Sequence, residues 1–481
     1  MNKYNFLMAA IHNVMDYYHI PGCAIAIIDK GKSFYFHFGY ENIEKHIPFT
    51  LETVSGIGSC TKSMTAFAIM RLMDQGILDI DVPIHTYIPG FALYDEKASQ
   101  MVTIRDMLCH RTGVAGHDGT WPNDSISRKE FVYRLKYMQP NVAFRTLAQY
   151  SNVMYVALGG IMEMVTGKTW ETILKEEIFD PLEMKHTYCH LSDAYKSGHM
   201  AMPHLWDHKL KVISPWKIDM AGPCGSVMST IQDMCTWVRM HMQNGQWQGK
   251  QLLSSSLFRD MHTPQIIMNY PHLKMGTAIG YGLGWRILMY HDTEIQQHTG
   301  KIEGYSAFQF YVPKEDSGAV FIDNLHTPSN PFFFTLQGLL LDYFLGIPQQ
   351  DWLSFYIHRG GKNQEEIYHQ LEFNYMPKRC VKETKPSHLL QDYEGIYSNP
   401  AYGEFTIRMN KNELELDERC VRHCPMKHFH YDTFSVEKIK EDTNIYTIPL
   451  TFLTNTDTGD ISGFTLRMEP KVSDIFFHRI K

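Results

Sequence analysis

One stretch near the N-terminus constrains the fold of this chain most, because it places a serine one helical turn before a lysine at the head of an apolar segment. Ser59 and Lys62 begin the stretch, and Gly76 ends it. Apolar residues recur nearly all round this segment, which predicts a central helix packed on every side. Side chains three positions apart share a helix face, so we expect the Ser59 hydroxyl and the Lys62 amine to meet.

The serine and lysine pair indicates covalent chemistry. A serine hydroxyl is a poor nucleophile until a base removes its proton, and a lysine whose ammonium form is disfavoured by burial can be that base. The start of a helix also presents unpaired backbone N–H groups, which suit the oxyanion that forms when a carbonyl is attacked. We therefore predict that Ser59 is a nucleophile activated by Lys62.

The Ser-x-x-Lys spacing occurs twice more, so the spacing alone is a weak signal. Ser214 precedes Lys217, but a proline follows the serine and no long helix is available there. Ser435 precedes Lys438 in an alternating, strand-like region, where residues three apart point to opposite faces. The helical context selects Ser59.

Composition narrows the class of protein and of partner. The 481 residues exceed one ordinary core, and 44% hydrophobic with 20% charged residues describes a folded globular protein. The formal net charge is -7 and no basic block occurs, so neither nucleic acid nor an anionic membrane is an expected partner. We expect a small molecule or a short peptide as the substrate.

Neither export nor membrane insertion is expected. Residues 1 to 20 read as an amphipathic helix without a secretory pattern, and no run approaches the roughly 20 apolar residues that a membrane-spanning helix needs. Nine cysteines, an odd number, are scattered along the chain, which fits a reducing compartment better than a disulfide framework. The sequence thus predicts a cytoplasmic protein.

Alternation of apolar and polar residues predicts one antiparallel sheet in the first 349 residues. Residues 23–28 and 33–38 suggest a hairpin, and four strands between residues 283 and 323 suggest a meander. Helical segments are expected at 59–76, 103–109, 152–165, 170–179, 230–244, 252–261 and 332–344. The predicted fold class is α+β, with helices flanking the sheet and an all-helical region beside it.

The remaining chain divides into two pieces. Residues 350–385 are polar and mixed, with glycine and proline breakers, and are interpreted as a connector. Residues 386–481 consist of short strands and turns, which predicts a small all-β barrel or sandwich. We expect a domain over 1–349, a connector over 350–385 and a barrel over 386–481.

Two further motifs offer partners for the serine. Tyr150-Ser151-Asn152 stands at the start of the helix expected at 152–165, where a phenol and an amide can project into a cleft. A structural interpretation stays open, in which Asn152 caps the helix and Tyr150 packs in the core. His298-Thr299-Gly300 ends a strand of the meander, and Gly300 is expected to let a substrate lie close against the strand.

The ordered motifs Ser-x-x-Lys, Tyr-x-Asn and His-Thr-Gly resemble the superfamily of serine β-lactamases and penicillin-binding proteins. They are most similar to the class C β-lactamase-related serine hydrolases, which include esterases and D-aminopeptidases. The resemblance covers about residues 21 to 348, including Gly280 to Trp285. It implies a β-lactamase/transpeptidase-like fold and hydrolysis through an acyl-enzyme, without a cofactor or a metal.

The resemblance also implies residue roles. Ser59 would be acylated, Lys62 would activate it, and Tyr150 would shuttle protons with the lysine. The residues implied to bind substrate are Asn152, His298, Thr299, Gly300 and Lys301, the last through its backbone N–H, which would share the oxyanion hole with the Ser59 N–H. The penicillin-recognising members carry lysine where this chain has His298, so the resemblance favours the esterase and D-aminopeptidase branches.

The C-terminal piece resembles the lipocalin-like barrel appended to several of these hydrolases. The similarity lies in Tyr393-Glu394-Gly395-Ile396-Tyr397 and in the run from His428 to Phe434. In such proteins the barrel can lie near the mouth of the active site or mediate assembly. The resemblance therefore implies a limit on substrate size or a homo-oligomer formed through the barrel.

The predicted function is hydrolysis of a small ester, amide or peptide through a Ser59 acyl-enzyme. The alternatives are β-lactamase or DD-peptidase activity, and a non-catalytic binding protein of the same fold. A zinc site is a weaker interpretation of Cys420, His423, Cys424, His428 and His430, whose spacing is not that of a standard finger. Cys60, His110 and His117 are expected to have packing or loop-bordering roles rather than direct catalytic ones.

Overall fold

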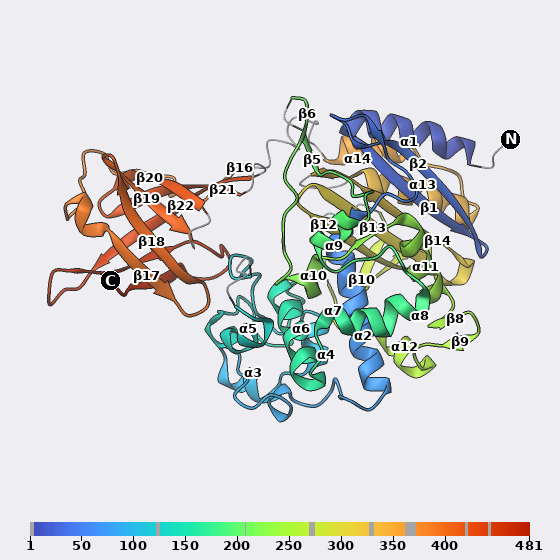
Figure 1. The fold of residues 1–481 in the computed structure, drawn as a ribbon, viewed down its shortest axis with the longest axis horizontal. Coiled ribbons are helices and arrows are strands. Elements are labelled where there is room, and N and C mark those ends of the chain that lie inside the picture. Colours follow the sequence, from blue (N-terminus) through green and yellow to red (C-terminus); the bar gives the residue numbers. More distant parts are fainter. Residues whose placement is uncertain are drawn as a thin grey trace.

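A computed structural model describes residues 4–121, 126–206, 208–268, 275–326, 331–360, 372–418, 422–440 and 444–481. Figure 1 shows a larger part made of helices and sheets, with a smaller all-β part beside it. The larger part precedes the smaller one along the chain. This arrangement confirms the predicted α+β fold class followed by a small barrel.

The larger part is organised around an eight-stranded antiparallel sheet. Its spatial order is β10 (Thr277–Tyr281), β11 (Arg286–Tyr290), β12 (Thr293–Ile302), β13 (Tyr305–Val312), β14 (Ser317–Asp323), β1 (Gly22–Asp29), β2 (Lys32–Asn42) and β3 (Ile47–Pro48). The predicted hairpin and meander join where β1 pairs with β14, with Cys23 opposite Asp323. Strand β10, which the sequence analysis did not predict, extends the meander by one strand.

Strand β1 shows how the sheet separates two cores. Every residue of β1 is buried, and successive side chains point to opposite faces. Cys23, Ile25 and Ile27 pack with α1 (Asn5–Tyr18) and α13 (Pro331–Leu345). Their neighbours in sequence, Ala24 and Ala26, belong to the core on the other face of the sheet. Both faces are covered, so the strand is apolar throughout instead of alternating.

The second core contains most of the helices, among them the expected central helix after Ser59. These elements are α2 (Thr61–Asp74), α3 (Glu96–Met101), α4 (Ile104–Leu108), α5 (Arg128–Arg134), α6 (Asn152–Thr166), α7 (Trp170–Leu174), α8 (Asp180–Leu182), α9 (Leu191–Lys196), α10 (Gly222–Gly225), α11 (Ile231–Met242) and α12 (Ser255–Met261). Helix α2 is buried continuously from Thr61 to Met70. Helix α6 is buried from Val153 to Met162 and ends at Gly167, whose φ of 73° makes a left-handed C-cap.

Short paired strands connect the larger elements. They are β4 (Ser55–Gly56) with β7 (Met228–Ser229), β5 (His204–Trp206) with β6 (Leu210–Val212) and β15 (Leu325–His326), and β8 (Gln246–Trp247) with β9 (Lys250–Gln251). The β4–β7 pair comes directly before the Ser59 turn and directly after α10. It therefore holds the residues that precede the nucleophile against a segment about 170 positions later in the sequence.

The expected connector contains regular structure that the sequence analysis did not predict. Helix α14 (Trp352–Gly360) and strand β16 (Glu372–Asn374) lie in it. Trp352 is only 2% exposed, and its Nε1 donates a hydrogen bond of 2.8 Å to Asp342 Oδ2 in α13. The first turns of this segment are therefore packed on the sheet-covering helices.

The C-terminal part is a closed barrel of eight strands, with β16 added at its side. The strands are β17 (Gly395–Asn399), β18 (Gly403–Asn410), β19 (Glu413–Glu418), β20 (Arg422–His430), β21 (Thr433–Lys440), β22 (Asn444–Thr454), β23 (Ile461–Leu466) and β24 (Ile475–Arg479). Pairing of β17 with β24 and of β22 with β23 closes the sheet. Aromatic rings in mutual contact fill the interior, among them Tyr397, Phe452, Phe464 and Phe477.

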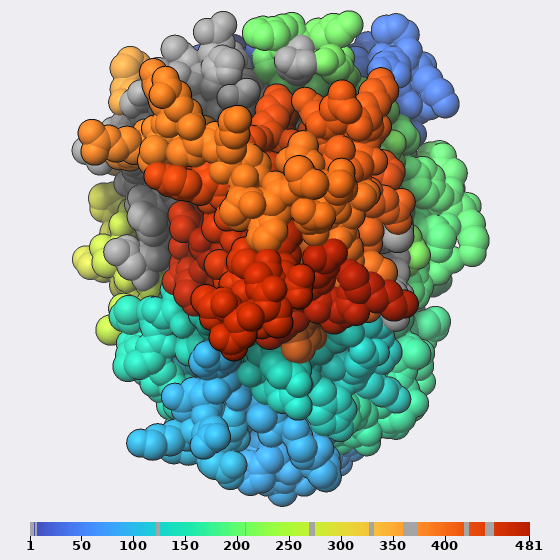
Figure 2. All heavy atoms as spheres, turned by 90° about the vertical axis from the view of Figure 1, so that its left-hand side faces the viewer, coloured from blue at the N-terminus to red at the C-terminus, as the bar shows by residue number. Residues whose placement is uncertain are grey.

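The barrel lies directly against the helical region. Figure 2, viewed from the barrel side, shows orange and red barrel atoms bordering the cyan and teal segments of the larger part. Ser473 Oγ donates a hydrogen bond of 2.6 Å to Gln139 Oε1 across this boundary. In the described part of the chain, none of the helices combines the length and apolar character needed to cross a bilayer.

Candidate active site

Ser59 lies in a single turn of 3-10 helix, Gly58–Cys60, that leads directly into α2. Gly58 has a φ of 48°, and a Cβ on it would lie 2.4 Å from the backbone nitrogen of Lys301. A side chain at position 58 would therefore be strained and would clash with β12. The glycine lets the serine turn sit against the strand, and Ser59 itself stays partly exposed.

Lys62 is fully buried and contacts Ser59 as the spacing predicted. Its Nζ lies 3.0 Å from Ser59 Oγ, 2.8 Å from Asn152 Oδ1 and 2.7 Å from the carbonyl oxygen of Cys224 in α10. The rings of Tyr150 and Tyr155 flank the amine, with centroids 5.0 Å and 5.5 Å from Nζ. Three segments of the chain thus meet at this one amine: the Ser59 turn, residues 150–155 and Cys224.

The three oxygen partners of Lys62 have different capacities. An amide oxygen and a backbone carbonyl can only accept hydrogen bonds, so they take two N–H groups. The remaining position on the nitrogen faces Ser59 Oγ. In the neutral amine that position is a lone pair, which can accept the hydroxyl proton of Ser59. This arrangement can activate the serine without rearranging the lysine.

Asn152 begins α6 and is fixed from both ends of its amide. Its Oδ1 accepts from Lys62 Nζ at 2.8 Å, and its Nδ2 donates to Asp118 Oδ1 at 3.0 Å. No side chain caps α6 at Ser151. Asn152 therefore orients Lys62 in this structure, whereas the resemblance implied that it binds substrate. Asp118 had no role predicted from the sequence.

Tyr150 packs in the site but does not hydrogen-bond the nucleophile. Its hydroxyl is buried and has no hydrogen-bond partner within the described part of the chain. Its ring contacts those of His110 and His298, with centroids 4.3 Å and 6.4 Å away. The structure thus places the phenol ring next to Lys62, with a buried hydroxyl that no described group bonds.

His298 is a neutral group held by two hydrogen bonds. Its Nδ1 lies 2.6 Å from the carbonyl oxygen of Thr299, which can only accept, so Nδ1 carries the hydrogen. Its Nε2 then accepts from the Tyr281 hydroxyl at 2.9 Å. Burial, followed by the positive charges of Arg286 and Lys62, holds the pKa of His298 well below its usual range. His298 therefore does not supply a cation at neutral pH.

A cation comes instead from Arg286, which the sequence analysis missed. This half-buried residue begins β11, and its Nη1 donates to Thr299 Oγ1 at 2.8 Å. Its guanidinium carbon lies 5.7 Å from the centre of the Tyr150 ring. Arg286 directly follows Gly280 to Trp285, a segment that contributes to the family resemblance. The resemblance therefore ended one residue before this functional candidate. A guanidinium beside Thr299 and Tyr150 can bind a carboxylate.

Gly300 has a different structural role from the one expected. A Cβ at position 300 would lie 1.8 Å from the carbonyl oxygen of Ile57 and 3.0 Å from the backbone nitrogen of Cys60. The space beside the strand is therefore occupied by the serine turn of the protein itself, not left for a substrate. This close approach sets the distance between the backbone of Ser59 and that of Lys301.

The other candidates fall outside this geometry. Ser214 is exposed in an irregular segment, and Ser435 lies in β21 of the barrel. Cys60 is fully buried, and burial raises the pKa of its thiol, so it is no rival nucleophile. Burial also holds the pKa of His110 well below its usual range.

The weak zinc interpretation finds no support in the described residues. His423 Nδ1 pairs with Asp417 at 2.5 Å and His428 Nε2 with the carbonyl oxygen of Tyr431 at 2.8 Å. Across the described part of the chain, His, Cys, Asp and Glu side chains form no group of three suited to a metal ion. Cys420 lies outside the described residues.

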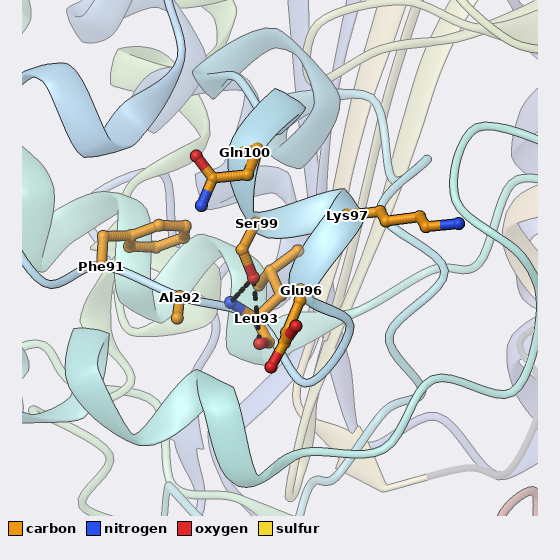
Figure 3. A pocket seen from close by; sticks show the side chains of 7 residues that line it. All are labelled: Phe91, Ala92, Leu93, Glu96, Lys97, Ser99 and Gln100. Atoms are coloured by element: carbon orange, nitrogen blue, oxygen red, sulfur yellow. Dashed lines mark hydrogen bonds between the residues drawn. The ribbon is translucent and has the colours of Figure 1, made fainter.

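A separate hollow lies on the helical region and contains none of the site residues. It has a volume of about 400 Å³ and is lined by Phe91, Ala92, Leu93, Glu96, Lys97, Ser99 and Gln100. Figure 3 shows Ser99 bonded to the backbone of Leu93 and Lys97 pointing away. Its polar groups serve the local turn and helix α3.

Comparison with family models gives two matches. Residues 7–336 match the family described as Beta-lactamase. Residues 379–479 match a domain of unknown function, DUF3471. The first match contains every site residue described above, and the second covers the barrel strands.

Comparison with curated proteins and solved structures gives relatives of low identity. Unguisins hydrolase ungD' of Aspergillus campestris is 27% identical over 82% of this chain and 76% of that protein. Penicillin-binding protein 4 of Amycolatopsis lactamdurans is 28% identical over 69% of this chain and 87% of that protein. The octameric penicillin-binding protein homologue from Pyrococcus abyssi has a TM-score of 0.59 at 22% identity, covering 99% of this chain and 100% of that chain. The structure of SurE has a TM-score of 0.59 at 18% identity over 99% and 98% of the two chains.

Proposed function

The chain belongs to the β-lactamase family of hydrolases, and from that premise we propose that it hydrolyses a small ester, amide or peptide through an acyl-enzyme on Ser59. We assign this activity to a hydrolase domain over residues 1–349, joined by a connector over 350–385 to the barrel over 386–481. The names of two relatives, a hydrolase and a penicillin-binding protein, agree with the reaction class.

One observation carries the proposal. Lys62 Nζ has two partners that can only accept and a third position facing Ser59 Oγ at 3.0 Å. A buried amine held in this way is suited to remove a proton from the serine. A non-catalytic binding protein would not need a base directed at a serine hydroxyl.

Acylation begins when Ser59 Oγ attacks the substrate carbonyl carbon. The hydroxyl proton passes to the lone pair of Lys62 as the new C–O bond forms. The carbonyl electrons move onto oxygen, and the backbone N–H groups of Ser59 and Lys301 stabilise that oxyanion. When the intermediate collapses, the bond to the leaving group breaks, and the leaving group takes the proton from Lys62 through the Tyr150 hydroxyl.

Hydrolysis of the acyl-enzyme reverses the same transfers. Water attacks the ester carbonyl while its proton passes through Tyr150 to Lys62. The bond between the acyl carbon and Ser59 Oγ then breaks, and the proton returns to the serine. The free hydroxyl of Tyr150 is suited to this exchange, because no described partner holds it in another direction.

Arg286 favours a second candidate within this reaction class. We infer that a substrate carrying a carboxylate, as peptides and β-lactams do, places it against the Arg286 guanidinium beside Thr299. His298 was expected to weaken recognition of such substrates, because lysine occupies its place in the penicillin-recognising members. Arg286 offers the permanent charge that His298 lacks, so peptidase or β-lactamase activity regains support beside esterase activity.

Fluorophosphonate labelling tests the proposal. The full chain is incubated with the probe, and the adduct is located by peptide mass spectrometry. We expect one label on Ser59, and loss of both label and p-nitrophenyl ester turnover in Ser59→Ala. The matched controls are Ser214→Ala and Ser435→Ala, the serines of the two other Ser-x-x-Lys spacings, which should label like the unchanged protein. Labelling elsewhere, or turnover by Ser59→Ala, contradicts the proposal.

A further inference from the structure

The loop that carries His117 and Asp118 lies between the Ser59 site and the barrel. These two consecutive residues form hydrogen bonds with different parts of the protein. His117 contacts the barrel, and Asp118 contacts Asn152 at the start of α6. The loop is thus a physical link between the C-terminal barrel and the residue that orients Lys62.

Two barrel residues hold His117. Glu469 Oε2 accepts a hydrogen bond of 2.8 Å from the backbone N–H of His117. His117 Nε2 lies 2.8 Å from the carbonyl oxygen of Gln139 and must donate to it, so Nδ1 accepts from the Tyr402 hydroxyl at 2.7 Å. Tyr402 is 1% exposed and Glu469 7%. These bonds lie inside the boundary between the two parts, away from water.

The conformation of His117 needs this support. Its φ is 45°, in the left-handed region, where a residue other than glycine costs about 1 kcal/mol or more. The side chain is fully buried, and burial lowers its pKa, so it stays neutral. Such a residue keeps its conformation only where the surroundings determine it, and here two of the residues that hydrogen-bond it, Tyr402 and Glu469, come from the barrel.

The next residue transmits that placement to the site. Asp118 Oδ1 accepts from Asn152 Nδ2 at 3.0 Å and from the Trp121 indole N–H at 3.0 Å. An ionised carboxylate only accepts hydrogen bonds, so it fixes which end of the Asn152 amide faces it. The amide oxygen is then the end left for Lys62. If Asp118 moved away, the amide could turn and present its NH2 group to the amine.

We propose that Tyr402 and Glu469 are positioning residues, and that the barrel acts through His117, Asp118 and Asn152 to hold Lys62 against Ser59. This inference rests on the proposed serine hydrolase activity. The barrel completes the site without touching the substrate. Its removal or displacement leaves Ser59 in its turn and Lys62 on α2 but frees the amide that directs the lysine.

The test uses the full chain and follows two rates, Ser59 labelling by fluorophosphonate and turnover of a p-nitrophenyl ester. Tyr402→Phe removes only the hydroxyl, and Glu469→Ala removes the acceptor for the His117 N–H. We expect each to lower kcat and the labelling rate about tenfold, since small misplacements of catalytic groups cost up to about 100-fold. KM should change less than twofold, a limit of about 0.4 kcal/mol, because neither residue contacts the substrate.

Two matched variants separate positioning from loss of the interface. Glu469→Gln keeps an oxygen that can accept from His117 and should restore most of the rate. Ser473→Ala removes a bond to the Gln139 side chain across the same boundary, whereas His117 bonds only the backbone carbonyl of Gln139, so this variant should react like the unchanged protein. Thermal unfolding of each variant confirms that the compared proteins are folded.

A double substitution decides the route. In Asp118→Ala the link to Asn152 is already broken, so adding Tyr402→Phe should slow the reaction no further. The inference is overturned if the rate losses of the two substitutions multiply in the double variant. It is also overturned if Tyr402→Phe and Glu469→Ala react as fast as Ser473→Ala. Failure of the unchanged protein to label at Ser59 overturns the proposed function instead, so the two failures are distinguishable.

Discussion

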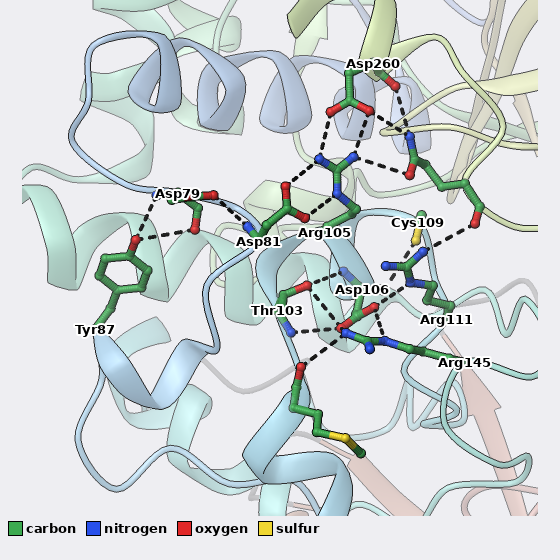
Figure 4. A network of polar contacts seen from close by, with 12 residues as sticks. Asp79, Asp81, Tyr87, Thr103, Arg105, Asp106, Cys109, Arg111, Arg145 and Asp260 are labelled. Atoms are coloured by element: carbon green, nitrogen blue, oxygen red, sulfur yellow. Dashed lines mark hydrogen bonds and ion pairs between the residues drawn. The ribbon is translucent and has the colours of Figure 1, made fainter.

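Two buried titratable side chains in the larger part have opposite kinds of partner, charged in one case and neutral in the other. Asp106 in α4 and Lys62 in α2 are both 0% exposed. Asp106 bonds Arg111 at 2.5 Å and Arg145 at 2.7 Å, and it also accepts from Thr103 (Figure 4). The described partners of Lys62 are a hydroxyl, an amide oxygen and a carbonyl oxygen, none of which carries a charge.

The difference separates a structural charge from a reactive one. Burial alone would raise the pKa of Asp106, but the hydrogen bonds from Arg145 and Arg111 lower it, so the carboxylate stays ionised. The Asp106 carboxylate, paired with two arginines, has a structural role, because removing one member of a buried pair leaves an uncompensated charge. Lys62 instead has only neutral described partners, and one position on its amine faces Ser59 Oγ, as a base for that hydroxyl requires.

Substitution of Lys62 should have the largest effect on activity and a small one on stability. We expect Lys62→Met to lower kcat/KM for esters about 100- to 10,000-fold, the usual range for loss of a general base. The free energy of unfolding should change by less than about 2 kcal/mol, because no opposite charge is left unpaired. Ester kinetics and urea unfolding measure the two effects.

Lys62→Arg is the informative companion. A guanidinium keeps the positive charge but cannot be deprotonated in a protein. We expect this variant to be as inactive as Lys62→Met. Substantial turnover by Lys62→Arg would show that only the charge matters and would remove the contrast with Asp106.

Substitution of Asp106 should reverse the pattern. Asp106→Ala leaves two arginines without their buried partner, and removing one member of a buried pair costs about 3–5 kcal/mol of unfolding free energy. Asp81→Ala is the control, because Asp81 pairs with Arg105 at 2.6 Å but its side chain is 53% exposed, and exposed pairs contribute about 0–1 kcal/mol. Urea unfolding should separate the two variants, whereas equal losses would mean that burial does not matter here.

The sequence predicted local parts of this site better than distant ones. The contact of Ser59 with Lys62 follows from helical spacing, and the structure has it at 3.0 Å. The positions of Asn152 and His298 came only from their order along the chain, which carries no distances. Asp118 and Arg286 received no role, because their contacts join segments 34 and 13 residues apart with no shared periodicity.

The fold shows the same division. Period-two alternation predicted the hairpin, the meander and the barrel strands, since each pattern is local. Strand β10 was missed, and its register shifts between Ala278 and Gly280, which interrupts the alternation. Helix α14 was missed because its polar and aromatic residues acquire a role only against α13, where Trp352 is buried. Tertiary packing decides such segments.

Substitution of Arg286 tests whether its positive charge binds a carboxylate of the substrate. We expect Arg286→Gln to lower kcat/KM about 10- to 100-fold for an ester or amide with a free carboxylate, since hydrogen bonds to charged groups contribute about 1.5–3 kcal/mol. The matched neutral ester should lose less than about threefold. Paired kinetics on the two substrates measure the ratio. Equal losses would assign Arg286 to structure, like Arg111 and Arg145.

His262 extends the comparison outside the site, because it is a partly buried titratable group with neutral described partners and no nucleophile beside it. It contacts His241 Nδ1 at 3.0 Å, Gln296 Oε1 at 3.2 Å and the Tyr311 hydroxyl at 3.1 Å. Burial lowers the pKa of His262 from 6.5 to about 4.

A lowered pKa in the folded state means that the unfolded chain binds the proton first as the pH falls. The stability contributed by neutral His262 is therefore present above about pH 6.5 and is lost as the pH falls toward 4. From pH 7 to pH 5 the loss should be about 2 kcal/mol. In His262→Gln, unfolding free energy should fall by that much less over the same interval, as measured by urea unfolding at both pH values. Equal losses of unfolding free energy between pH 7 and pH 5 in the two proteins would contradict this prediction. They would mean that His262 does not account for the pH dependence of stability.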